Sequence, residues 1–151
     1  MAKQKSIRTI ATDLDPNAPS VNLSDYFIKV STRDAEKTAR MSKNFSRKIP
    51  IDGVMTIAND VPYTVALTAT ELGLPSISIE SAKIASDKLL MKKAFSANQI
   101  PCPVHYELSS FQDLKRIIED SDNERFVLKP NDGRGARGVL ILDQDIDLYW
   151  A

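Results

Sequence analysis

The stretch from Phe126 to Leu142 constrains the fold more than any other part of the sequence. It begins with the apolar run Phe126–Leu128 and ends with a second apolar run, Val139–Leu142, and both are typical of short β-strands. The loop between them contains glycines at positions 133, 135 and 138. Glycine adopts positive φ angles and lets a ligand approach closely, and consecutive N–H groups in such a loop can converge on an anion. The sequence therefore predicts two antiparallel strands joined by an anion-binding loop.

The three glycines match the pattern G-x-G-x-x-G, which is a weak signal by itself. A Rossmann dinucleotide site requires a helix to begin there, whereas a strand-like run follows here. The Walker pattern is absent, because no Gly-Lys-Ser/Thr follows. Two interpretations remain: a glycine flap like the one that covers ATP phosphates in protein kinases, or an ordinary glycine-rich hairpin. A flap predicts a loop that is mobile without nucleotide. A helix beginning at Gly135 would restore the Rossmann interpretation.

Two arginines and a lysine add positive charge to the loop, and this combination suits a polyphosphate. Arg134 and Arg137 lie within it, and Lys129 ends a predicted strand that otherwise looks buried, so its ammonium group reaches either water or a ligand. Lys88 follows Asp87 in the first turn of a predicted helix, an uncommon position for a cation if only the helix dipole mattered. Two lysines that converge on phosphates would neutralise the charge that develops during phosphoryl transfer.

The first half of the chain alternates strand and helix patterns, which predicts right-handed crossovers and a Rossmann-like parallel sheet. Asp34 is the expected N-cap of a helix reaching about Lys48, and Gly73 the expected end of the next helix. Asp60 is the expected N-cap of that second helix. It also follows a predicted strand, where open α/β sheets bind ligands, so we consider it a candidate substrate contact. The predicted strands are Ile7–Thr12, Tyr26–Val30, Val54–Ile57 and Leu74–Ile79.

The second half begins near residue 81, which predicts two domains, residues 1–81 and 82–151. Its predicted elements are a helix Asp87–Ala97 capped by Ser86 and ended by Asn98 in a left-handed conformation, a strand Val104–Leu108, and a helix Phe111–Glu119 capped by Ser109 or Ser110.

Composition excludes several classes of protein. The 20 basic and 20 acidic residues give a formal net charge of zero, which argues against a dedicated nucleic-acid binder. The single cysteine, Cys102, cannot form an internal disulfide, and the lone histidine, His105, lacks the partners of a zinc site. No apolar run approaches the roughly 18 residues of a membrane-spanning helix. We therefore expect a cytoplasmic protein without a membrane partner.

Several short motifs, in this order and spacing, resemble the opening of an ATP-grasp domain. They are Ala85–Lys88, Lys92, Ile100–Pro103, Val127–Pro130 and Gly133–Val139. The preceding region, through Asp52–Val54 and Glu71–Pro75, resembles the pre-ATP-grasp domain of the biotin carboxylase and carbamoyl-phosphate synthase group. The resemblance covers nearly the whole chain. It implies a partial pre-ATP-grasp domain over residues 1–81 and the start of the ATP-grasp fold, with its first glycine-rich β-hairpin, over residues 82–151.

The resemblance implies that Lys88 and Lys129 contact ATP phosphates and that a mobile flap closes over them. The family uses ATP and Mg²⁺ to convert a carboxylate into an acyl phosphate, which an amine or another nucleophile then attacks. The implied partners are ATP and small-molecule carboxylate and amine substrates, with a homodimer left open; the alternative is a non-catalytic nucleotide-binding or interaction module. No residue is assigned a catalytic or metal-ligating role. The implied flap residues are Gly133, Arg134, Gly135, Ala136, Arg137 and Gly138.

The chain departs from the family pattern at several points. Gln99 stands where a glycine is usual, and Ala136 where a serine is frequent. From the resemblance we expect the first sheet strand of the family to be absent from this sequence, and the adenine-binding hinge and Mg²⁺ ligands to lie beyond it. After Gly138 the only acidic residues are Asp143, Asp145 and Asp147. We therefore expect a fragment that does not catalyse ligation alone.

Overall fold

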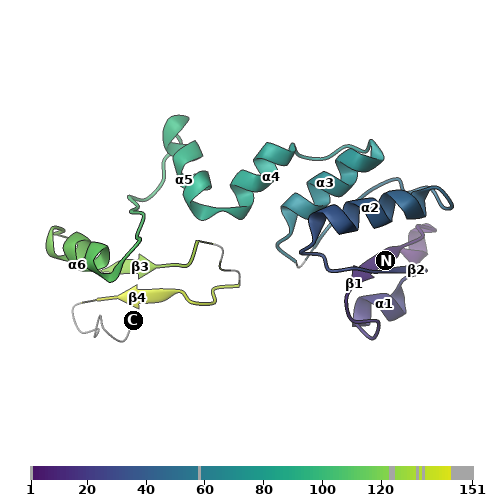
Figure 1. The fold of residues 1–151 in the computed structure, drawn as a ribbon, viewed down its shortest axis with the longest axis horizontal. Coiled ribbons are helices and arrows are strands. Elements are labelled where there is room, and N and C mark those ends of the chain that lie inside the picture. The colour runs from purple at the N-terminus through teal and green to yellow at the C-terminus, as the bar shows by residue number, and fades with distance from the viewer. Residues whose placement is uncertain (1, 58, 123–124, 132, 134, 144–151) are drawn as a thin grey trace. The chain divides into compact units, whose positions relative to one another are not determined.

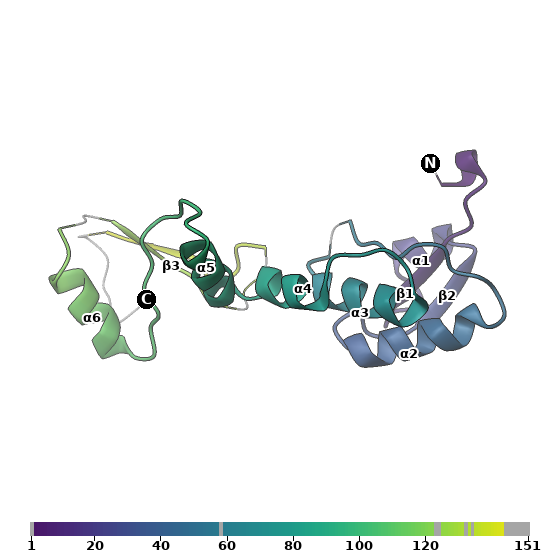
Figure 2. The same cartoon turned by 90° about the horizontal axis from the view of Figure 1, so that it is seen from above.

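The computed structural model describes residues 2–57, 59–122, 125–131, 133 and 135–143. The chain divides into two compact units, Met1–Ser86 and Asp87–Ala151. The predicted flap residue Arg134 and the acidic residues Asp145 and Asp147 lie outside the described residues. Figures 1 and 2 show the elements of both units from two directions.

The first unit is a small α/β layer structure. After a short 3₁₀ helix, Lys3–Lys5, strand β1 (Ile10–Asp13) pairs in parallel with strand β2 (Tyr26–Lys29). Helix α1 (Pro19–Leu23) connects the two strands on one side of the sheet, and helix α2 (Ala35–Ser46) lies on the other side (Figure 1). The register places Ala11 opposite Phe27 and Thr12 opposite Ile28. The predicted mixed α/β class with a parallel sheet is therefore confirmed.

Two predicted strands of this unit are wrong. Residues 51–57 contain no strand, and Met55 and Ile57 are 74% and 88% exposed. The residues from Leu74 to Ser78 also form no strand, and Ile79 already begins helix α4 (Ile79–Ser86). An extended apolar segment becomes a strand only where another strand offers backbone hydrogen bonds. The described sheet of this unit contains only β1 and β2.

Small side chains allow helices α2 and α3 (Pro62–Leu72) to pack closely against each other. A hydrogen bond joins α3 to the turn between β2 and α2, because the Thr64 hydroxyl donates to the Thr32 carbonyl at 2.7 Å. An exposed ion pair between Lys43 and Glu71, at 2.8 Å, also links the two helices. The buried faces consist of Ala35, Thr38, Ala39 and Ser42 on α2 and Thr64, Ala66, Thr68 and Ala69 on α3.

The helix ends of the first unit test three predicted caps. Asp34 caps α2 as predicted, because its carboxylate accepts a hydrogen bond from the Lys37 amide at 3.0 Å. Gly73 ends α3 as predicted, with φ of 69° in the left-handed region. Asp60 is not the cap of α3, because the N-cap residue is Val61, whose side chain cannot accept a hydrogen bond. The Pro62 ring sets the start of the helix, so the cap shifts one residue toward it.

The second unit begins at the N-cap of helix α5 (Lys88–Ala97). Asp87 caps this helix instead of the predicted Ser86, whose hydroxyl donates to the Ala82 carbonyl within α4. A carboxylate that accepts the Leu90 amide at 2.9 Å satisfies an otherwise unpaired donor. The two compact units divide between Ser86 and Asp87, and residue 81 lies within α4 of the first unit; the assignment of residues 1–81 and 82–151 to two domains stays a prediction.

The residue that leaves α5 in a left-handed conformation is Gln99, with φ of 57°. The predicted residue, Asn98, has φ of −102° and is the C-cap. Residues 104–108 form no strand, so the predicted strand Val104–Leu108 is wrong. Val104 is 79% exposed. Helix α6 (Phe111–Glu119) is capped by Ser110, one of the two predicted residues, whose hydroxyl accepts the Asp113 amide.

Strands β3 (Phe126–Leu128) and β4 (Leu140–Leu142) pair antiparallel, as predicted. The register places Phe126 opposite Leu142 and Val127 opposite Ile141. Side chains alternate between the two faces of the ribbon, so Leu142 is 2% exposed whereas Val127 and Ile141 are 56% and 64% exposed. The strand pair therefore has one face toward the interior of its unit. In the described part of the chain, no helix is long and apolar enough to cross a membrane.

Candidate functional site

Lys88 lies in the first turn of α5, and its ammonium group reaches the loop that follows β3. It donates hydrogen bonds to the carbonyl oxygens of Pro130, Asn131 and Gly133, at 3.0, 3.0 and 2.7 Å. An ammonium group has three donors, and the three carbonyls engage all of them. The structure therefore brings Lys88 to the base of the glycine-rich loop, immediately after Lys129.

A second set of contacts joins the same two segments. The Asn131 amide nitrogen donates to the Asp87 carboxylate at 2.9 Å, while the Asn131 amide oxygen accepts from the Leu89 backbone N–H at 3.1 Å. The other carboxylate oxygen of Asp87 accepts from the Leu90 N–H at 2.9 Å. The N-terminus of α5 is therefore capped by its own aspartate and by an asparagine from the loop.

These contacts lower the pKa of the Asp87 carboxyl group. The hydrogen bond from the Leu90 N–H, followed by the one from Asn131, lowers the pKa of Asp87 below its usual value of 3.8, because both bonds favour the ionised form. The Lys93 ammonium group contributes in the same direction. In α6 the Ser110 hydroxyl and then the Ser109 amide lower the pKa of Asp113 in the same way.

Acidification is therefore expected to remove the stability that Asp87 provides. A carboxyl group whose pKa is lower in the folded protein stabilises it above the unfolded pKa of 3.8, and this contribution is lost as the pH falls through the folded value. Urea unfolding of the wild type and of Asp87→Asn should differ most near pH 6, and the difference should narrow below about pH 4. A difference that stays constant down to about pH 2 would contradict this account.

Two glycines of the loop lie close to Pro130, and close approach requires glycine at position 133. A Cβ atom on Gly133 would lie 2.5 Å from the Pro130 ring, and one on Gly138 would lie 3.2 Å from it. Gly135 and Gly138 have φ angles of 59° and 69°, and Ala136 adopts 59° without being glycine. A left-handed residue with a Cβ is strained, so this conformation is costly at Ala136. Among the described residues, no helix begins at Gly135, and the predicted mobility of the loop stays a prediction.

Of the other predicted basic residues, the two that the structure describes are exposed. Lys129 directly follows β3 with its side chain exposed, and the Arg137 side chain in the loop is exposed as well. Lys88, Lys129 and Arg137 all belong to the second unit, and of these three Lys88 is the one that the described loop carbonyls engage. Asp60 is exposed and belongs to the first unit. Its proposed contact with substrate stays a prediction.

Sequence reasoning singled out Lys88 but missed Asn131 and the role of Asp87 beside it. A signal was present in the pairing of an Asp-Lys helix start with an amide directly after Lys129-Pro130. Asparagine carries one acceptor and two donors, so it can bind a carboxylate and a backbone N–H together. The tertiary contact between α5 and the loop decides which carboxylate and which backbone N–H the Asn131 side chain binds.

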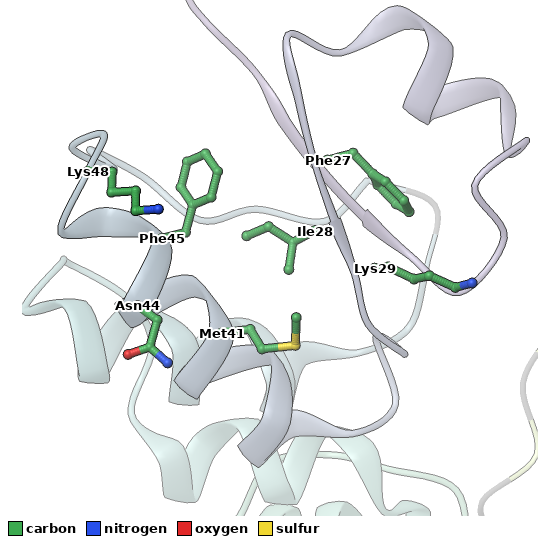
Figure 3. A pocket seen from close by; sticks show the side chains of 7 residues that line it. All are labelled: Phe27, Ile28, Lys29, Met41, Asn44, Phe45 and Lys48. Carbon is green, nitrogen blue, oxygen red and sulfur yellow. The ribbon is translucent and has the colours of Figure 1, made fainter.

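Other chemical groups in the described part of the chain form no comparable site. No three or more His, Cys, Asp or Glu residues gather in it as a metal site would require. His105 is exposed and Cys102 is half-buried. A cavity of about 400 Å³ lies between β2 and α2 in the first unit (Figure 3). Apolar side chains of both elements line it, with Lys29 and Lys48 beside them, and it contains none of the predicted site residues.

The chain is similar to known ligases in sequence and in fold. Residues 7–76 match the family model of the ATP-grasp N-terminal domain. A stretch of 79 residues is 34% identical to phosphoribosylamine–glycine ligase of Methanothermobacter thermautotrophicus, covering 50% of this chain and 18% of the ligase. The chain thus spans less than a fifth of the length of this curated relative.

Two crystal structures share the fold. N5-carboxyaminoimidazole ribonucleotide synthetase from Thermotoga maritima matches 99% of this chain and 38% of its own, with a TM-score of 0.67 and 23% identity. L-amino acid ligase from Bacillus licheniformis matches 95% of this chain and 35% of its own, with a TM-score of 0.72 and 19% identity. At these identities the likeness concerns the fold alone.

Proposed function

We propose, from the match of residues 7–76 to the ATP-grasp N-terminal domain, that the chain is the ATP-binding portion of a ligase that activates a carboxylate as an acyl phosphate for attack by an amine or another nucleophile. The observation that carries the proposal is the hydrogen bond from the Lys88 ammonium group to the carbonyl of Pro130, at the base of the glycine-rich loop. Pro130 directly follows Lys129, the second candidate phosphate contact. We further propose that residues 1–81 and 82–151 correspond to the pre-ATP-grasp domain and the start of the ATP-grasp domain, in a cytoplasmic protein.

The proposed site holds a polyphosphate through positive charge and backbone amides. Lys88, Lys129 and Arg137 supply the charge, and the loop glycines let the backbone approach an anion closely. ATP with Mg²⁺ would supply the phosphoryl group and neutralise part of its charge. The chain's own residues would bind and orient the phosphates, with Arg134 as a further contact, while Asp60 is proposed as a substrate contact.

Lys88 would have to exchange at least one loop carbonyl for a phosphate oxygen in order to take part in binding. A phosphate oxygen carries a negative charge that a carbonyl oxygen lacks, so its Coulomb attraction to the ammonium group favours the exchange. Lys129 has no such competition from the described loop carbonyls, since its side chain is exposed. We therefore expect Lys129 to be the clearer reporter of nucleotide binding.

Replacing Lys129 with alanine is expected to weaken the binding of Mg²⁺-ATP about tenfold, because one charge-assisted phosphate contact is lost. The measurement is a calorimetric or NMR titration of the 151-residue chain with Mg²⁺-ATP. The matched control is Lys48→Ala, because Lys48 is an exposed lysine of the first unit. Equal dissociation constants for the two variants would contradict the assignment.

A nucleotide-binding module without turnover is the second candidate. The observation in its favour is that three backbone carbonyls already engage Lys88, so that this lysine also has a structural role. The two candidates differ in one result for a longer polypeptide that includes this chain. A ligase releases ADP or phosphate in the presence of a carboxylate and an amine, whereas a binding module does not. Acidic Mg²⁺ ligands in a longer polypeptide would favour the ligase.

A further inference from the structure

We infer that Asn131 and Asp87 are positioning residues that fasten the base of the glycine-rich loop to the N-terminus of α5 and thereby fix the place of the Lys88 ammonium group. We call the Asp87 carboxylate, the Asn131 side-chain amide and the Leu89 N–H the clasp. The consequence for nucleotide binding rests on the proposed function, whereas the fastening itself does not. All of these residues belong to the second unit.

Both the nitrogen and the oxygen of the Asn131 side-chain amide form hydrogen bonds in the clasp. The Asn131 Nδ2 donates to Asp87 Oδ2 at 2.9 Å, and the Asn131 Oδ1 accepts from the Leu89 N–H at 3.1 Å. The Asn131 backbone carbonyl also accepts from Lys88 at 3.0 Å. One loop residue therefore contacts three consecutive residues of the helix start, more than 40 positions earlier in the chain.

Helix capping alone does not require this arrangement. The Asp87 Oδ1 already caps α5 by accepting from the Leu90 N–H, in the way that the Ser110 hydroxyl caps α6 by accepting from the Asp113 N–H. The added contacts of Asn131 come from the loop, so their effect is to tie two segments that are distant in sequence. Asn131 lies between Pro130 and Gly133, and the carbonyls of these two residues accept hydrogen bonds from Lys88.

The donors and acceptors of the clasp are directional. The change Asn131→Asp would place two carboxylates against each other. The change Asp87→Asn would place two NH₂ groups against each other, because the side-chain oxygen at position 87 must stay on the Leu90 N–H. Exchanging both residues restores every bond. The carboxylate then at position 131 would accept from the Leu89 N–H and from the amide at position 87, whose oxygen would still accept from Leu90.

This reciprocity gives the test. Amide hydrogen exchange of Leu89 is measured by NMR in the full 151-residue chain for the wild type, Asn131→Asp, Asp87→Asn and the double exchange. Each single variant is expected to exchange the Leu89 amide about tenfold faster than the wild type, and the double variant within about twofold of it. The Asp113 amide, capped by Ser110 in α6, is the internal control and should change in none of them.

A second readout links the clasp to the proposed site. Each single variant is expected to raise the dissociation constant for Mg²⁺-ATP several-fold, and the double exchange to restore it. A purely structural cap would leave this constant unchanged. If the wild type does not bind ATP, the proposed function fails, whereas the exchange rates still decide the clasp. Single variants that exchange Leu89 at the wild-type rate, or a double variant that remains as fast as the single ones, would overturn the inference.

Discussion

Replacing Leu142 with alanine is expected to lower the free energy of unfolding by about 2–5 kcal/mol. Leu142 is 2% exposed and is one of the largest fully buried side chains among the described residues. Its truncation removes apolar surface from the interior and leaves a cavity that the strand pair cannot fill, because β3 and β4 are joined in a fixed register. The measurement is urea denaturation, with amide exchange in β3 and β4 to assign the loss to the second unit.

Ile141→Ala is the matched control for this prediction. Ile141 is the adjacent residue of the same strand and lies on its opposite face, 64% exposed. Its truncation removes the same kind of aliphatic side chain without leaving a cavity, so the expected change is within about 0.5 kcal/mol. Similar losses for the two variants would mean that β4 does not have a buried and an exposed face in solution.

Replacing Lys88 with methionine is expected to destabilise the second unit by about 2–3 kcal/mol. Methionine keeps an unbranched apolar stem of similar length, so the change removes mainly the ammonium group. The carbonyls of Pro130, Asn131 and Gly133 then lose their common donor, while the contacts of the clasp remain. Urea denaturation measures the loss, and amide exchange of Leu89 reports whether the clasp persists.

Lys93→Met is the control for Lys88→Met, because Lys93 lies in the same helix. Its ammonium group forms an ion pair with Glu107 at 3.3 Å, and its side chain is 65% exposed. Exposed ion pairs contribute less than about 1 kcal/mol, so this variant should remain close to the wild type. If Lys93→Met were as destabilising as Lys88→Met, the contacts between Lys88 and the loop would not be specific.

The sequence by itself determined the features that depend on neighbouring residues. Asp34, Gly73 and Ser110 end or begin their helices as predicted, because a cap requires only a suitable side chain or a missing Cβ at the right offset. The pairing of β3 with β4 was predictable for the same reason, since two apolar runs flank a glycine loop. The family resemblance followed from short motifs in order, and the match of residues 7–76 supports it.

The tertiary structure alone decided the features that need a distant partner. The runs at Val54–Ile57, Leu74–Ile79 and Val104–Leu108 have strand composition, yet in the described chain they form no strand. Composition can make a segment suitable for a strand, but only a neighbouring backbone can supply its hydrogen bonds. Lys88 and Asn131 illustrate the same limit. The sequence shows that one side chain is a cation and the other an amide. Their hydrogen-bond partners, however, are decided by the tertiary contact between the loop and α5.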